Sequence, residues 1–325
     1  MEITKVKMKQ DHKTKIEYDL HPDFKPAKFF HTFMNPFIIK IINSVNSFMI
    51  NKVKSNKEIT IQNRKLMSKD GGFFNIKVIK PISKEKKMPC IIHFHGGGFM
   101  YKAYPLVLRH SIVYAKNIKC AVIMVDYRLS PKYPFPKGFE DCYKAFEWAS
   151  SQPEFDSDRI VLSGESAGGA LAAAVAQKAR DIHGPKVCYQ MLIYPVTDDS
   201  LNTKSMKTYL KAPIWTVNNN KIMWNRYLRH GDYNMKSYAA PLKAKSFKNL
   251  PSAYIEVAEF DCLRDEGIRY GQLLKEAGVD TEIRIVKGAM HGYDGFAYSK
   301  ITKEQMQYRI KLLRSKLWKD KIGIS

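Results

Sequence analysis

The strongest constraint on the fold is an alternation of short apolar runs with longer segments of helical pattern. The runs lie at 88–94, 121–125, 159–162 and 189–194, and the helical segments between them at about 104–116, 137–150 and 167–183. Strands that are apolar along their whole length and separated by helices are typical of a parallel sheet buried on both faces. The sequence therefore predicts an α/β fold with a mostly parallel central sheet flanked by helices.

The pattern is interrupted at about 198–247, where Trp, Tyr, Lys and Asn gather with helical character. It resumes with strands at 253–257 and 281–286 and helices at about 264–277 and 302–318. A hairpin with strands at about 59–61 and 73–79 precedes the alternation, with a turn at Asp70-Gly71-Gly72. We expect one catalytic domain at 57–325, with a helical cap inserted at about 198–247.

Residues 1–56 form the expected N-terminal segment of this cap. Apolar residues recur there at helical spacing, at Phe37, Ile38, Ile41, Ile42, Val45 and Phe48. A helix with such a face must cover something, and we expect it to pack over the rest of the protein rather than against a membrane.

The charge balance is strongly basic, with 54 Lys and Arg against 31 Asp and Glu, a net charge of +23. These lysines are scattered from Lys5 to Lys321 and accompany no zinc-finger spacing, basic zipper or RNA-binding aromatic motif. We expect no specific nucleic-acid partner and no surface-binding module that works through charge alone.

The location is predicted from what the sequence lacks. The N-terminus has no apolar core of a secretory signal, and no run reaches the ~18 apolar residues of a transmembrane helix. The 5 cysteines are odd in number and show no CxxC spacing, which fits a reducing compartment. We expect a cytoplasmic protein without a membrane span; the oligomeric state stays open, a homodimer included.

The most specific motif is Gly164-Glu165-Ser166-Ala167-Gly168, which follows an apolar run and precedes a helix rich in alanine. A sharp strand-to-helix turn of this kind exposes a serine nucleophile in a strained backbone, so Gly164 and Gly168 must lack side chains. Amide N–H groups at the start of the helix then face the reacting centre.

A second motif, His95-Gly96-Gly97-Gly98-Phe99, directly follows the strand at 88–94. Consecutive glycines let amide N–H groups turn into a cavity, as an oxyanion hole requires. The run lacks the Lys-Ser/Thr of a phosphate-binding P-loop. His93 and His95 could form a metal pair, but we expect their imidazoles to diverge, and we predict no metal site and no cofactor.

A serine nucleophile needs a histidine base, and the base needs a carboxylate. Downstream of the serine the histidines are His183, His230 and His291, and His291 is favoured because it follows a strand at the sheet edge where ligands bind. Asp261, also after a strand, is the favoured acid. The alternatives are Asp265, Glu259 and Asp294.

These motifs together resemble the hormone-sensitive-lipase family of α/β-hydrolases. The matching stretches are HGGGF at 95–99, DYRLSPKYPFP at 126–136, GESAGG at 164–169, AEFDCLRDEG at 258–267 and MHGYDGF at 290–296. They occur in the family's order from about residue 70 to the C-terminus. Lys132 and Cys262 depart from residues that are frequent in the family, and the first 56 residues match no motif.

The resemblance implies an α/β-hydrolase fold and a carboxylesterase that acts on small acyl esters. It implies Ser166 as nucleophile, Asp261 as acid and His291 as base. The oxyanion donors would come from Gly96, Gly97 and Gly98, most of all the last two, with the Ala167 amide, and His95 would hold the loop.

Short to medium acyl chains are expected, in a pocket shaped by cap residues such as Tyr209, Trp215 and Trp224. The alternatives are an amidase or a deacetylase of a specific small molecule with the same triad, and a hydrolase-like protein that binds its ligand without turning it over. A lipase with a lipid-docking face is not expected.

Overall fold

The computed structural model describes residues 18–229 and 235–318. Its centre is one 8-stranded sheet with the strand order β1-β2-β4-β3-β5-β6-β7-β8. The pairs β1–β2 and β2–β4 are antiparallel, and every later pair is parallel. The predicted α/β fold is thus confirmed, and the hairpin before the alternation supplies the antiparallel edge.

The strands are β1 (Ile59–Met67), β2 (Phe73–Pro81), β3 (Met88–Phe94), β4 (Ala121–Asp126), β5 (Phe155–Glu165), β6 (Tyr189–Ile193), β7 (Ala253–Phe260) and β8 (Thr281–Met290). The α-helices are α1 (Pro36–Lys52), α2 (Pro105–Ile118), α3 (Lys137–Ser151), α4 (Ala167–Asp181), α5 (Lys204–Thr208), α6 (Val217–Tyr227), α7 (Lys236–Ala239), α8 (Arg264–Glu276) and α9 (Lys300–Leu317). Short 3₁₀ helices are η1 (Pro22–Phe29), η3 (Pro241–Lys243) and η4 (Tyr293–Gly295).

Helices cover both faces of the sheet. Along β3, Cys90 and Ile92 belong to one buried cluster and Ile91 to the other, because successive strand residues point to opposite faces. The cluster of Ile91 includes residues of α2 and α9, and that of Ile92 includes residues of α3, α4 and α8. This two-sided burial explains why the central strands β3 and β4 have no solvent-exposed face, in contrast to the edge strand β1.

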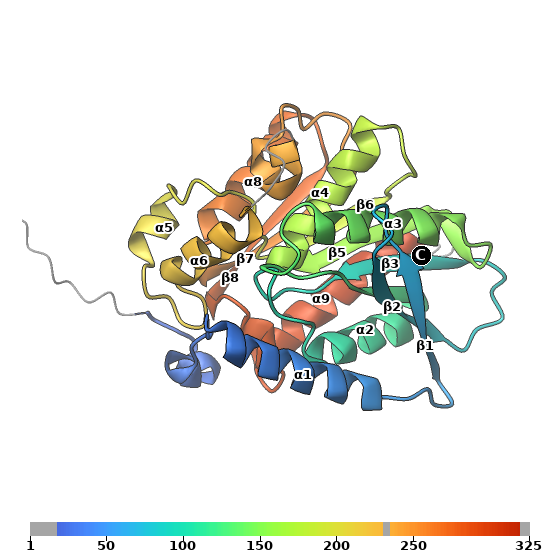
Figure 1. Ribbon diagram of the computed structural model, residues 1–325, viewed down its shortest axis with the longest axis horizontal. Coiled ribbons are helices and arrows are strands. Elements are labelled where there is room, and N and C mark those ends of the chain that lie inside the picture. Colours follow the sequence, from blue (N-terminus) through green and yellow to red (C-terminus); the bar gives the residue numbers. More distant parts are fainter. Residues whose placement is uncertain (1–17, 230–234, 319–325) are drawn as a thin grey trace, which may run out of the picture.

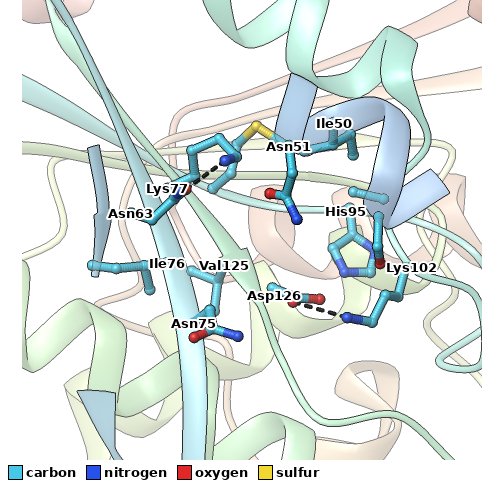
Figure 2. Close-up of a pocket in the computed structure, with 13 residues that line it drawn as sticks. Ile50, Asn51, Asn63, Asn75, Ile76, Lys77, His95, Lys102, Val125 and Asp126 are labelled. Carbon is cyan, nitrogen blue, oxygen red and sulfur yellow. Dashed lines mark hydrogen bonds and ion pairs between the residues drawn. The ribbon is translucent and has the colours of Figure 1, made fainter. Parts of the chain in front are cut away.

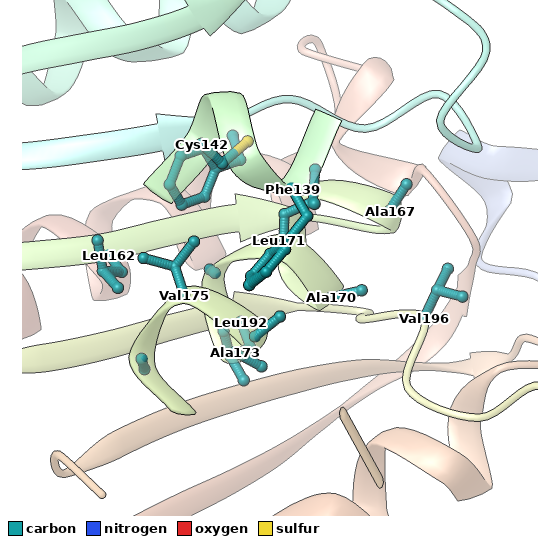
Figure 3. Packing of buried hydrophobic residues seen from close by; sticks show 14 of the residues in the cluster. Phe139, Cys142, Leu162, Ala167, Ala170, Leu171, Ala173, Val175, Leu192 and Val196 are labelled. Carbon is teal, nitrogen blue, oxygen red and sulfur yellow. The ribbon is translucent and has the colours of Figure 1, made fainter. Parts of the chain in front are cut away.

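Alanines let α4 pack closely on the sheet at the centre of the molecule. Figure 3 shows Ala170, Leu171 and Ala173 of α4 with Leu162 of β5 and Leu192 of β6 in one apolar cluster. The close packing holds the first turn of α4 rigidly at the end of β5.

The segment between β6 and β7 contains α5, α6 and α7, where the strand–helix alternation was expected to stop. In Figure 1 α5 and α6 lie at the left end of the molecule, and α1 runs along its lower edge beside α2. No helix in 18–229 or 235–318 is long and apolar enough to cross a bilayer.

The packing expected of the N-terminal helix is wrong for one face of α1. Ile39 and Ile50 are buried, but Phe37, Ile41 and Phe48 are exposed to solvent. Apolar periodicity predicts that a helix has an apolar face; it does not tell which side of the helix meets the protein. Residues 1–17 of this segment lie outside the described residues.

Candidate active site

Ser166 lies at the turn between β5 and α4, with φ +56° and ψ −120°. This is a conformation that L-residues rarely adopt and that clusters at functional sites. A Cβ added to Gly164 would lie 2.2 Å from the Gly168 carbonyl oxygen, and one added to Gly168 would lie 1.9 Å from that of Phe94. Backbone crowding on both sides of the serine therefore requires glycine at both positions.

His291 connects the serine to a carboxylate. Its Nε2 lies 2.8 Å from Ser166 Oγ, and its Nδ1 lies 2.7 Å from Asp261 Oδ2. Asp261 is fully buried, and its Oδ1 accepts a hydrogen bond from the Leu263 amide at 2.9 Å. Because the carboxylate only accepts, Nδ1 carries the proton and Nε2 is left to accept the serine hydroxyl proton.

The alternative acids all have other partners. Asp265 accepts hydrogen bonds from Arg264 and the Ser205 amide, and Glu259 from Lys287 and the Gly288 amide. Asp294 is held by Tyr194 and Arg309. Of the alternative bases, His183 lies beyond the far end of α4, and His230 lies outside the described residues.

The glycine loop approaches the serine from β3. Gly97 and Gly98 have φ of +110° and +57°, and both line the same cavity as Ser166 and His291. Within the described chain, neither of their amides donates a hydrogen bond to another protein group. The Ala167 amide begins α4 and has no acceptor within that helix. Three free N–H donors thus lie around the serine.

Gly96 requires a correction to the expected set of oxyanion donors. Its amide donates to Glu165 Oε1 at 3.1 Å, so it is already occupied. The other carboxylate oxygen of Glu165 lies 2.8 Å from His93 Nε2. Burial would raise the pKa of Glu165, but His93, the Gly96 amide and His95 together hold it below its ordinary value. The charged Glu165 thereby ties the glycine loop to strand β5, which ends next to Ser166.

This link between Glu165 and the glycine loop was not predicted from the sequence. In the serine motif Glu165 occupies the variable position next to Ser166. The structure shows that β3 and β5 are neighbours and that His93 pairs with Ser163 in register. Glu165, two positions after Ser163 on β5, therefore reaches the His93 imidazole on β3.

The reason for expecting His93 and His95 to diverge does not hold, because residues two apart in an extended chain share a face. Both imidazoles lie near enough to Glu165 to lower the pKa of its carboxyl. His95 stacks on Tyr127 with ring centroids 4.4 Å apart, and its Nδ1 donates to the Gly96 carbonyl at 2.8 Å. Its buried Nε2 has no hydrogen-bond partner in the part of the chain that the structure describes. Figure 2 shows the ring on the wall of a polar cavity of about 320 Å³, near the ion pair of Lys102 with Asp126.

A cavity of about 690 Å³ is lined by Ser166 and His291. Its surface is mostly apolar. The lining residues come from the N-terminal segment, the glycine loop, the insertion after β6 and the loop of His291. The aromatic and aliphatic ones include Phe30, Phe33, Ile42, Tyr101, Tyr194, Ile214, Trp215 and Phe296. Trp215 lines it as expected. Tyr209 packs on Arg264 and Trp224 on Tyr227, outside this lining.

A buried ion network supports the loop that carries His291. Arg309 of α9 pairs with Glu256 of β7 and, at 3.2 Å, with Asp294 of η4. The Tyr194 hydroxyl donates to Asp294 at 2.6 Å, and its ring packs edge-on against His291 at 4.8 Å. The imidazole is thus positioned by groups from three distant parts of the chain.

Glu266, near Asp261, offers a pH-dependent test of stability. It is fully buried, its Oε1 accepts the amides of Thr197 and Asp198, and its Oε2 has no hydrogen-bond partner among the described residues. Burial, with contributions from Asp198 and Asp261, raises its pKa well above the ordinary 4.5. The pKa of this carboxyl is higher in the folded protein than in the unfolded chain. The free energy of unfolding is therefore highest below the unfolded-state pKa and falls as pH rises toward the folded-state pKa.

Glu266→Gln keeps the Oε1 acceptor and does not titrate. We expect the unfolding free energy of the variant, relative to wild type, to increase with pH above 4.5 by up to about 1.4 kcal/mol per pH unit. Urea unfolding of both proteins between mildly acidic and neutral pH measures this. A difference that stays constant with pH would contradict the raised pKa.

Comparison with known proteins gives consistent matches. The model of a family described by its alpha/beta hydrolase fold matches residues 91–295, from β3 to η4. Esterase LipI from Mycobacterium tuberculosis is 38% identical over 217 residues, 66% of this chain and 68% of LipI. Carboxylesterase NlhH from the same species is 33% identical over 232 residues, 68% of this chain and 72% of NlhH. A solved bacterial heroin esterase has a TM-score of 0.84 at 29% identity, covering 92% of this chain and 98% of that one.

Proposed function

Because this chain belongs to the hormone-sensitive-lipase family of α/β-hydrolases and is a carboxylic ester hydrolase, we propose that it cleaves short- to medium-chain acyl esters through an acyl-enzyme on Ser166. One observation carries the proposal: the unbroken contact from Ser166 Oγ to His291 Nε2, and from His291 Nδ1 to Asp261, at 2.8 and 2.7 Å. These are the distances that proton transfer requires.

In the first step, His291 accepts the Ser166 hydroxyl proton as the oxygen attacks the ester carbonyl. The negative charge that develops on the carbonyl oxygen is stabilised by the amides of Gly97, Gly98 and Ala167. Each such donor contributes on the order of 3 kcal/mol in comparable hydrolases. Asp261 stabilises the imidazolium and keeps its proton on Nδ1.

Collapse of this intermediate breaks the ester C–O bond, and the imidazolium gives its proton to the leaving alcohol. Water then attacks the acyl-enzyme, with His291 again as the base, and the carboxylic acid is released. The residues Glu165 and His95 act as positioning residues in this scheme, because they hold the glycine loop and not the substrate.

We propose the segment 1–56 and the insertion 198–247 as the cap of this site. The proposal is supported by the cavity lining, which takes Phe30 and Phe33 from the first and Trp215 from the second. The cytoplasmic location, a homodimer and the lack of a nucleic-acid partner stay predictions from the sequence.

The function is tested with p-nitrophenyl esters of increasing acyl length, together with the matching p-nitroanilide. We expect kcat/KM to peak at short to medium chains and fall for long ones, with at least a hundredfold lower rate for the anilide. The apolar lining favours each added methylene until the cavity is filled, by about 0.8 kcal/mol each. A faster anilide would indicate an amidase, and no turnover of any ester would indicate a ligand-binding protein.

A further inference from the structure

Helix α1 turns apolar residues toward solvent, where an ordinary surface helix has polar ones. Its exposed side has Phe37, Ile41, Val45, Phe48 and Met49, spaced by three and four residues, and we call these five residues the apolar stripe. Phe37 is 71% and Phe48 is 62% exposed. Surface helices of soluble proteins place such residues inward.

The inward side of α1 is held partly by a polar residue. The side-chain NH₂ of Asn43 donates to the Met100 carbonyl at 3.0 Å, and its side-chain oxygen accepts the Lys102 backbone amide at 2.8 Å. These two bonds fix the rotation of the helix about its axis. The exposure of the apolar stripe is therefore built into the packing of α1 on the loop before α2.

Further exposed aromatics extend the surface toward the substrate. Phe29 is 85% exposed, and Phe30 and Phe33, each more than half exposed, also line the cavity of Ser166. Ile42 of α1 reaches the same cavity. One apolar surface thus runs along α1 to the entrance of the active site. Contiguous exposed apolar surface of this kind marks an interaction site.

The charges on this surface are all of one sign. Residues 24–57 contain six lysines and no Asp or Glu: Lys25, Lys28, Lys40, Lys52, Lys54 and Lys57. All six are exposed, and none pairs with a carboxylate of residues 18–229 or 235–318. Elsewhere lysines such as Lys116 and Lys137 do have acidic partners.

We propose that α1 docks this protein onto an anionic lipid surface, with the apolar stripe inserted at the level of the head groups and the lysines on the lipid phosphates. An amphipathic helix with an apolar face and flanking lysines binds membranes in this orientation. Each lysine near an anionic surface strengthens binding by a factor of about five. A second copy of the chain fits this surface poorly, because two such faces would bring lysines together without any carboxylate.

The proposed docking surface stands against the expectation that the protein has no lipid-docking face, which was drawn from the residues of the insertion and not from α1. Scattered lysines and a helix of ordinary amphipathicity gave no sign of it, because only the fold shows which side of α1 is covered. With the stripe in the lipid, the cavity entrance near Phe30 faces the same surface. If the proposed function holds, esters dissolved in the lipid enter without crossing water.

The test is co-sedimentation of the full-length protein with vesicles of phosphatidylcholine alone or of equimolar phosphatidylcholine and phosphatidylglycerol. We expect binding to the anionic vesicles. The double variant Phe37→Ser/Phe48→Ser should bind about a hundredfold more weakly, because burying one Phe contributes at least a factor of ten. Its matched control is Ile182→Ser/Ile285→Ser, whose side chains are 54% and 42% exposed at the end of α4 and on β8, and it should bind like wild type.

A second pair separates local charge from net charge. Lys40→Gln/Lys52→Gln should weaken anionic binding at least tenfold. Lys245→Gln/Lys248→Gln, which removes the same charge just after η3, should not. Hydrolysis of water-soluble p-nitrophenyl acetate by all variants should match wild type, so loss of docking and loss of catalysis are told apart. The proposal is overturned if a test variant and its matched control bind equally, or if the wild-type protein binds no vesicle. It is also overturned if light scattering shows a wild-type dimer that Phe37→Ser/Phe48→Ser converts to a monomer.

Discussion

Replacing Ser166 with Ala is expected to lower kcat for p-nitrophenyl butyrate by a factor on the order of 10⁶. The variant removes the oxygen that lies 2.8 Å from His291 Nε2 and would form the acyl-enzyme. The fold should persist, because Ala loses no cavity-filling atom except the hydroxyl and keeps the same backbone. Residual turnover would come from the amides of the glycine loop acting on a water molecule.

A fluorophosphonate probe gives the complementary measurement. It should label wild type at Ser166 and not the Ala variant, as read by peptide mass spectrometry. Ser111→Ala is the control, since Ser111 is a buried serine that bonds only to the Val107 carbonyl of its own helix. Ser166→Ala with wild-type turnover, or labelling of another residue, would remove Ser166 from the mechanism.

The centre of the sheet could be predicted because strands such as β3 and β4 are apolar and buried along almost their whole length. Runs such as 88–94 and 121–125 have no alternative location in a folded chain but the interior. The serine motif could be predicted because its residues follow one another in the chain: a Cβ at Gly164 would meet the Gly168 carbonyl oxygen, four positions on. The demand for glycine at Gly168 has a different cause, the approach of the Phe94 carbonyl from the neighbouring strand β3, which the sequence does not display.

What could not be predicted depends on contacts between distant residues. The bond between Glu165 and the Gly96 amide joins positions 69 residues apart, and Arg309 reaches Glu256 across 53. Nothing in the spacing of these residues distinguishes them from other charged residues. The outward face of α1 was missed for the same reason, because the side of a helix that is covered depends on its neighbours.

The identity of the acid is decided by comparing two nearby aspartates. Asp261→Asn is expected to lower kcat about 10⁴-fold, while Asp265→Asn should stay within a few-fold of wild type. Asp265 lies four positions on, accepts the Ser205 amide at 2.7 Å and has no contact with His291. It serves as the matched control, with the same chemical change in the same loop region, and a shared stability loss would appear in both variants.

The size of the effect follows from the contacts of Asp261. The Leu263 amide donates to Oδ1, so an asparagine would keep its carbonyl oxygen there and turn its NH₂ toward His291 Nδ1. An NH₂ donor requires Nδ1 to be the acceptor, which moves the imidazole proton to Nε2. A protonated Nε2 cannot take the Ser166 proton, although every heavy atom stays in place. Steady-state kinetics at neutral pH measure both variants, and a crippled Asp265→Asn beside an active Asp261→Asn would assign the acid to Asp265.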